Sequence, residues 1–176
     1  MIKTIFVARV YGVGKDYLCN KISNFSGIKK FSASQLISNI NNENYVKNKS
    51  VKNIDENQVI LIREVSRLLK DCKSIILTGH MCILNANMEI EELPSSVFNG
   101  LEITHMVLLK NEPDTIKQNL MKRDNKNYSL KLIEDFQKAE EEAFLITVQN
   151  IGAKSKIIDL VYDNSDVARF QKFLEE

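Results

Sequence analysis

Apolar positions along the chain follow two patterns that alternate from one end to the other. Short apolar runs rich in β-branched residues predict five strands, at residues 3–8, 28–31, 74–77, 103–109 and 156–161. Longer stretches with apolar residues every three or four positions predict helices, at residues 15–25, 32–40, 59–69, 112–122, 129–150 and 165–174. This alternation predicts an α/β fold, a three-layer sandwich of five parallel strands with helices on both faces.

No internal repeat or linker interrupts this pattern, so we expect a single domain over residues 1–176. The stretch NNENYVKNKSVKNIDEN, at residues 41–57, is polar with little periodicity and predicts a flap. The polar break that follows the helix at residues 112–122 predicts a lid at about residues 122–130.

The connection between the first strand and the first helix is rich in glycine. Residues 7–23 read VARVYGVGKDYLCNKIS, which is close to the phosphate-binding pattern G-x-x-x-x-G-K-[ST]. Backbone N–H groups of such a loop and the N-terminus of the next helix attract phosphate, and the lysine adds a positive charge. We therefore expect phosphate binding by a set made up of Tyr11, Gly12, Val13, Gly14, Lys15, Asp16 and Tyr17.

Two positions depart from the pattern. Arg9 replaces the first glycine, and its side chain either reaches over the site as an extra phosphate ligand or fills the site and blocks it. Asp16 replaces the hydroxyl residue that normally contacts Mg²⁺. A carboxylate here repels phosphate, by about 1 kcal/mol at ~4 Å in water, unless a bound Mg²⁺ takes it as a ligand.

These features resemble the adenylate-kinase-like nucleoside and nucleotide kinases of the P-loop class. The resemblance rests on the segments VYGVGKD, KKFSASQLI, SIILTGH and NLMKRDNKNY and on their order over nearly the whole chain. It implies ATP and Mg²⁺ as cofactors, with Arg123 as the lid arginine over ATP and Asp124 orienting it. It also implies that the ATP base lies between this lid and the turn near residues 163–165. Ser38 falls where many members have an arginine that grips the acceptor phosphate.

The resemblance also suggests where a metal would bind. Thr78 falls where the family usually has the Asp that holds Mg²⁺ through water, while Asp16 falls where it has a hydroxyl. One hypothesis is that the two positions have exchanged roles around Mg²⁺. The alternative is that both changed after activity was lost.

His80 is the third candidate catalytic residue beside Lys15 and Arg123. It follows a predicted strand at its carboxyl end, where open α/β sheets bind ligands. It either contacts the acceptor, acts as a base, or serves as a structural hydrogen-bond partner.

Composition limits the partners. The net charge is +1, so we expect no nucleic acid or membrane partner. Three cysteines without metal-ligand spacing indicate a reducing compartment, the cytoplasm. The first functional hypothesis is an ATP-dependent phosphotransferase acting on a nucleotide, nucleoside or other small molecule. The second hypothesis is a pseudokinase, a nucleotide-binding or wholly non-catalytic regulator that keeps the fold and for which a protein partner is possible. The third is a small subunit of a larger assembly.

Overall fold

The computed structural model describes residues 1–41 and 54–176, with the backbone alone for Lys15, Asn41, Ile54 and Asp55. Its centre is a five-stranded sheet in the order β2-β3-β1-β6-β7, in which every neighbouring pair is parallel. The strands are β1 (Thr4–Arg9), β2 (Lys29–Ser32), β3 (Ile75–Gly79), β6 (Ile103–Lys110) and β7 (Lys154–Asp159). The fold class predicted from the sequence is confirmed.

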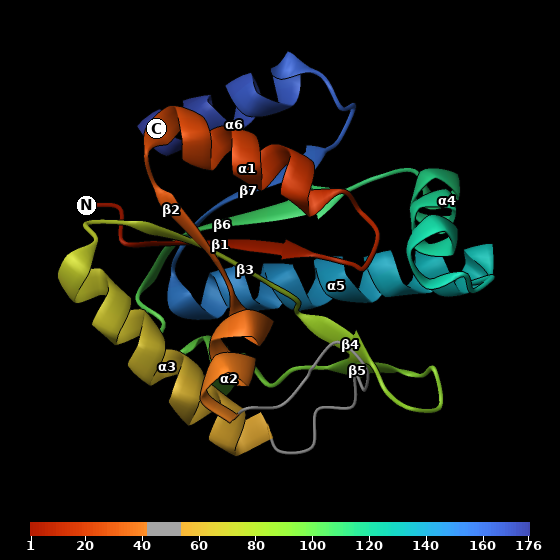
Figure 1. Cartoon of the computed structure of the whole chain (residues 1–176), viewed down its shortest axis with the longest axis horizontal. Helices are drawn as coiled ribbons and strands as arrows, with labels where there is room; N and C mark the ends of the chain where they lie inside the picture. Colours follow the sequence, from red (N-terminus) through yellow and green to blue (C-terminus); the bar gives the residue numbers. More distant parts are fainter. Residues whose placement is uncertain (42–53) are drawn as a thin grey trace.

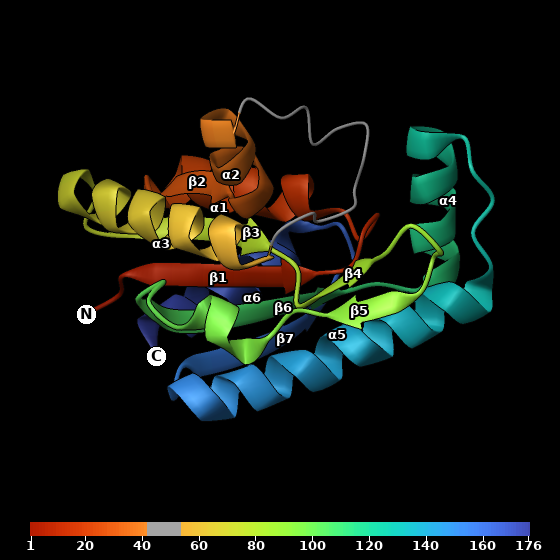
Figure 2. The ribbon, with the colours of Figure 1, turned by 90° about the horizontal axis from the view of Figure 1, so that it is seen from below.

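Helices cover both faces of this sheet. Helices α1 and α6 lie against one face and α3 and α5 against the other (Figures 1 and 2). The helices are α1 (Lys15–Ser26), α2 (Ala33–Asn41), α3 (Ile54–Asp71), α4 (Pro113–Asp124), α5 (Leu130–Ile151) and α6 (Asn164–Glu175). Among the helices of the described residues, none is both long enough and apolar enough to cross a bilayer.

Strand β1 lies in the middle of the sheet, between β3 and β6. All six of its residues are buried, which explains the continuous apolar run that the sequence shows. The strand includes Arg9, which pairs with Leu109 of β6, so the phosphate loop begins one residue later than the sequence suggested. The loop and helix α1 therefore start from the carboxyl edge of the central strand.

The sequence pattern did not predict the short strands between β3 and β6. Strands β4 (Cys82–Leu84) and β5 (Ile90–Glu92) form an antiparallel hairpin, and a 3-10 turn at Ser95–Phe98 follows it. Three-residue strands are too short to show a periodicity, so the pattern could not reveal them. Strand β7 also begins and ends two residues earlier than predicted.

The predicted flap at 41–57 falls mainly on residues 42–53, which lie outside the described residues. Its two ends belong to helices, because Asn41 closes α2 and residues 54–57 open α3. The predicted lid comprises the last turn of α4 and the connection to α5.

Candidate functional site

The glycine loop has a backbone that other residues could not adopt without strain. Gly12 and Gly14 have φ values of 81° and 93°, in the left-handed region. A Cβ atom on Gly12 would lie 2.8 Å from Cγ of Leu120, and one on Gly14 would lie 2.6 Å from Oη of Tyr162. Gly14 is also the N-cap of α1 and supplies no side-chain acceptor to its first turn. The first N–H groups of α1 therefore suit an anionic ligand.

Polar side chains hold the loop from outside. Tyr162 donates its hydroxyl to the carbonyl of Val13 at 3.1 Å, and Asn119 donates its amide to the carbonyl of Gly12 at 2.9 Å. Asn111 in turn donates to the Tyr162 oxygen at 2.7 Å. These contacts fix the loop carbonyls. None of the three residues stood out in the sequence.

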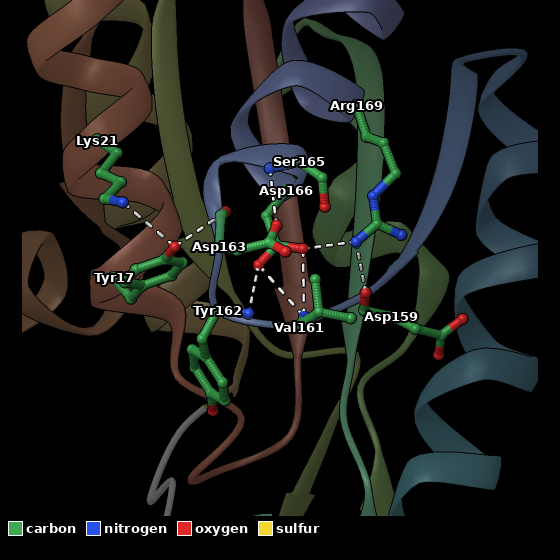
Figure 3. A network of polar contacts seen from close by, with 9 residues as sticks. All are labelled: Tyr17, Lys21, Asp159, Val161, Tyr162, Asp163, Ser165, Asp166 and Arg169. Carbon is green, nitrogen blue, oxygen red and sulfur yellow. Dashed lines mark hydrogen bonds and ion pairs between the residues drawn. The ribbon is translucent and has the colours of Figure 1, made fainter.

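The turn after β7 is fixed by a buried carboxylate (Figure 3). Asp166 is fully buried and accepts the backbone N–H groups of Val161, at 3.2 Å, and of Tyr162, at 2.8 Å. Arg169 donates both to Asp166 and to the Asp159 carbonyl. This network sets the backbone of Tyr162, whose side chain leaves the network and reaches the glycine loop.

A second contact joins the same turn to α1. Tyr17 donates its hydroxyl to the Asp163 carbonyl at 2.9 Å, and Lys21 donates to the Tyr17 oxygen at 3.2 Å. The turn at residues 160–165 and the start of α1 are therefore linked, at the place where the sequence predicts the ATP base. The binding of ATP there stays a prediction.

The two candidate metal ligands have separate partners in this structure. The Asp16 carboxylate forms an ion pair with Nζ of Lys30 at 3.0 Å, and its side chain is 64% exposed. Thr78 is buried and donates its hydroxyl to the carbonyl of Phe31 at 3.3 Å. The described residues contain no group of three or more His, Cys, Asp or Glu placed to hold a metal. A metal site here would thus depend on Asp16 together with nucleotide phosphates, an arrangement that Mg²⁺ commonly uses.

Arg123 lies in the last turn of α4, in the predicted lid. Its Nε and Nη2 donate to the two carboxylate oxygens of Asp124, each at 2.6 Å. The Tyr128 hydroxyl also donates to Asp124, at 3.1 Å. The expected contact between Arg123 and Asp124 is present, while a role over ATP stays a prediction.

His80 is held between the glycine loop and the end of β3. Its Nδ1 contacts the backbone carbonyl of Arg9, and its ring lies against that of Tyr11 with centroids 4.4 Å apart. Because a carbonyl oxygen only accepts, Nδ1 carries the proton, and in the neutral ring the lone pair is on Nε2. Burial raises the pKa of Tyr11 to about 12, which keeps its hydroxyl protonated.

A cavity of about 130 Å³ lies beside the loop, between α2, α3 and the carboxyl ends of β1 and β3. Its apolar wall includes Phe6, Ile37, Leu61, Ile83, Leu93 and Phe98. Its polar lining includes Arg9, Ser32, Ser34, Asn57, Thr78 and His80. We call it the Arg9 cavity.

Arg9 itself is only 6% exposed. From the sequence, this side chain could either reach over the phosphate site or fill it. In the structure it lies in the wall of the Arg9 cavity, next to the glycine loop. Its Nε is buried without a hydrogen-bond partner among the described residues. Burial lowers the pKa of Arg9 to about 10, although the nearby Asp16 and Glu140 carboxylates act in the opposite direction. The guanidinium remains charged at neutral pH.

Glu140 of α5 binds the backbone at the carboxyl end of β1 and in the segment that follows β3. It is fully buried, and it accepts the N–H groups of Arg9 at 3.0 Å and of Met81 and Cys82 at 2.8 Å each. Burial raises the pKa of its carboxyl to about 8, against the effect of these three donors and of Arg9. Glu140 thus ties the carboxyl end of β1 to the start of β4.

A sequence signal for Glu140 did exist. It occupies the buried stripe of α5, four residues after Phe136 and three before Ala143, where an apolar residue is expected. A charged residue on such a stripe is rarely buried unless it has partners. Asp166 gave a weaker signal, because an acidic residue in the first turn of a helix is common.

Comparison with known proteins places the chain in a family. Residues 10–137 match the AAA domain family, which is more than half of the 176 residues. The chain belongs to this family. No curated protein sequence matches it significantly.

Solved structures show how this member of the AAA domain family is folded. Shikimate kinase from Acinetobacter baumannii, in complex with shikimate, is 13% identical with a TM-score of 0.65, over 99% of this chain and 92% of that one. Shikimate kinase from Bacteroides thetaiotaomicron is 16% identical with a TM-score of 0.61, over the full length of both. Deoxyadenosine kinase from M. mycoides, with bound dATP, is 15% identical with a TM-score of 0.57, over 98% of this chain and 100% of that one. The fold is therefore that of small P-loop kinases.

Proposed function

We propose that this protein transfers the γ-phosphoryl group of ATP to a hydroxyl group of a small molecule. The observation that carries the proposal is the position of the Arg9 cavity next to the glycine loop, at one edge of the sheet. Phosphoryl transfer requires a phosphate site and an acceptor site that meet, and little covalent chemistry from the protein. The kinases with the same fold support this reading.

Each group of residues near the glycine loop has a separate proposed role in phosphoryl transfer. Backbone N–H groups of the loop and of the first turn of α1 bind phosphate, and Lys15 and Arg123 supply positive charge. The loop suits phosphate because Gly12 and Gly14 have positive φ values and Gly14 caps α1 without a side chain, which leaves the first N–H groups of α1 to a ligand. Mg²⁺, when bound, would neutralise phosphate charge, with Asp16 and Thr78 as the proposed residues on its protein side.

His80 is the proposed base for the acceptor. It lines the Arg9 cavity, and its Nε2 lone pair is suited to take the hydroxyl proton. The acceptor oxygen forms its bond to the γ-phosphorus as the bond from that phosphorus to the bridging oxygen breaks, and ADP leaves. The reducing cytoplasm is the proposed location, in keeping with the free thiols of Cys19, Cys72 and Cys82.

One observation favours the second candidate, a catalytically impaired nucleotide-binding regulator of a protein partner. Both candidate metal ligands already have partners, since Asp16 pairs with Lys30 and the Thr78 hydroxyl binds a backbone carbonyl. Such partners compete with Mg²⁺ and would weaken its binding.

Calorimetric titration with ATP, with and without Mg²⁺, tests the proposal first. We expect micromolar binding that requires Mg²⁺, and then ADP release when a library of small alcohols is added. Tight binding without turnover for any acceptor would favour the regulator, and no binding in either condition would overturn both readings.

A further inference from the structure

The Arg9 cavity combines two properties that rarely occur together. Most of its wall is apolar, with Phe6 and Phe98 packed edge to face at a centroid distance of 5.3 Å. Yet a buried arginine forms part of the same wall. Burying a charge is costly unless it is paired and hydrogen-bonded, so this arrangement needs a reason.

The carboxylates near Arg9 are largely committed elsewhere. The oxygens of Glu140 accept three backbone N–H groups, and Asp16 is paired with Lys30. The Nε of Arg9 has no hydrogen-bond partner in the described part of the chain. Arg9 lines the cavity, and a planar guanidinium is suited to an oxygen pair on a carboxylate or phosphate.

The size of the cavity limits the body of such a ligand. An apolar cavity of about 150 Å³ holds one benzene molecule in another protein. The Arg9 cavity, at about 130 Å³, therefore suits a single ring or a branched chain of similar size. Most of its wall is apolar, which favours an apolar body, and the polar lining residues named above are available to a hydroxyl group.

We propose that the Arg9 cavity binds an acceptor with a small apolar body, one hydroxyl group that receives the phosphoryl group, and one anionic group that pairs with the Arg9 guanidinium. The inference rests on the proposed function, because it names the acceptor of that reaction. Carboxylate and phosphate share the chemistry that Arg9 recognises. The specificity thus comes mainly from one buried cation, and the mostly apolar wall favours a body with few hydroxyl groups.

Four probes that share one ring test this proposal by calorimetry, without ATP and in a phosphate-free buffer. Cyclohexanecarboxylate and cyclohexyl phosphate carry the two candidate anions. Cyclohexanecarboxamide is neutral, and 3,4,5-trihydroxycyclohexanecarboxylate is polar around the ring. We expect at least one of the two simple anions to bind about 10- to 100-fold more tightly than the amide, the range for hydrogen bonds to charged groups. The better of the two identifies the anion, and the trihydroxy compound should bind more weakly than its parent.

Three variants locate the effect. Arg9→Met keeps the length of the side chain and removes its charge, so the preference for the anion over the amide should disappear. Arg9→Lys keeps the charge without the planar fork and should retain part of the preference. Arg67→Met is the matched control, because Arg67 is an exposed arginine of α3 paired with Glu64, and should bind all four probes as the wild type does.

The outcomes separate this inference from the proposed function. Equal binding of anion and amide by the wild type, or no binding of any probe, overturns the inference even if Arg9→Met fails to fold. An anion preference that persists in folded Arg9→Met also overturns it. Binding of Mg²⁺–ATP with no binding of the anionic probes leaves the proposed function in place and removes the inference. If the anion preference depends on Arg9 but ATP does not bind, the anion site is supported and the proposed kinase function is contradicted.

Discussion

The two sides of the glycine loop are both braced by a buried carboxylate, but they differ in where the cation lies. On the side of the β7 turn, Asp166 binds two backbone N–H groups, and its cation Arg169 is 39% exposed. On the cavity side, Glu140 binds three backbone N–H groups, and the cation beside it, Arg9, is buried.

The cation of the β7 side therefore reaches solvent, whereas the cation of the cavity side is almost fully buried. Arg169 donates to a carboxylate and to a carbonyl, so the charge of this side is paired, although its Nε has no hydrogen-bond partner among the described residues. Arg9 lies in the largely apolar wall of the Arg9 cavity and is only 6% exposed. We infer that the β7 side supplies a rigid support and the cavity side supplies recognition.

The largest effect should come from removing the two carboxylates. Glu140→Ala should lower the free energy of unfolding by about 3–5 kcal/mol, because three buried N–H groups lose their acceptor and the buried Arg9 loses a nearby acidic group. Asp166→Ala should cost less, about 1–3 kcal/mol, since Arg169 can turn to water. Urea denaturation measures both.

Glu142→Ala on the exposed face of α5 is the control and should change the unfolding free energy by about 0.5 kcal/mol or less. Equal costs for Glu140→Ala and Asp166→Ala would remove the contrast between the two sides.

The pH dependence of stability should reflect Glu140. Its pKa lies near 8 in the folded state against an ordinary value of 4.5, so the folded protein holds more protons than the unfolded chain between these values. Stability should therefore fall as the pH rises from about 5 to about 8, by on the order of 2–4 kcal/mol, and level off above.

Urea midpoints for the wild type and Glu140→Gln at several pH values check this. The variant lacks the titrating group, so its profile should be flatter over this range. Parallel profiles would mean that other groups cause the dependence.

Nucleotide binding should respond to a methyl group at the centre of the loop. Gly14→Ala places a Cβ 2.6 Å from the Tyr162 hydroxyl on a backbone with φ of 93°. We expect ATP affinity to fall by about 10- to 100-fold, or roughly 1.4–2.8 kcal/mol.

Gly152→Ala is the matched control, since its φ is 67° and nothing lies within 4 Å of the added Cβ. It carries similar backbone strain without the clash, so it should leave ATP binding unchanged. If both variants bind ATP as the wild type does, the loop is not the phosphate site.

The smallest effect concerns the two candidate metal ligands, Asp16 and Thr78. If Asp16 and Thr78 have exchanged roles, Asp16→Thr and Thr78→Asp should each weaken Mg²⁺-dependent ATP binding by about tenfold, or ~1.4 kcal/mol. The double variant should recover most of the loss. Calorimetry with Mg²⁺ provides the measurement, and a double variant no better than either single one would exclude the exchange.

The sequence by itself determined the elements and their order, because apolar periodicity reports which face of each segment is buried. Strand, glycine loop and helix were visible at residues 3–25, and the parallel sheet followed from the alternation of strands and helices. The hairpin formed by β4 and β5 was not visible, because its strands are held by the turn around Asn85 and by packing on α5.

Only the tertiary structure decided how the site is built. Arg9 and Glu140 are 131 positions apart, and Asn111 and Tyr162 are 51 apart, so no local pattern could pair them. Burial decides whether such a group is paired, strained or left for a ligand, and burial depends on which distant segments pack around it. The chemistry of the Arg9 cavity therefore depends on the folded chain, whereas the spacing of the glycines in the sequence already predicts the glycine loop.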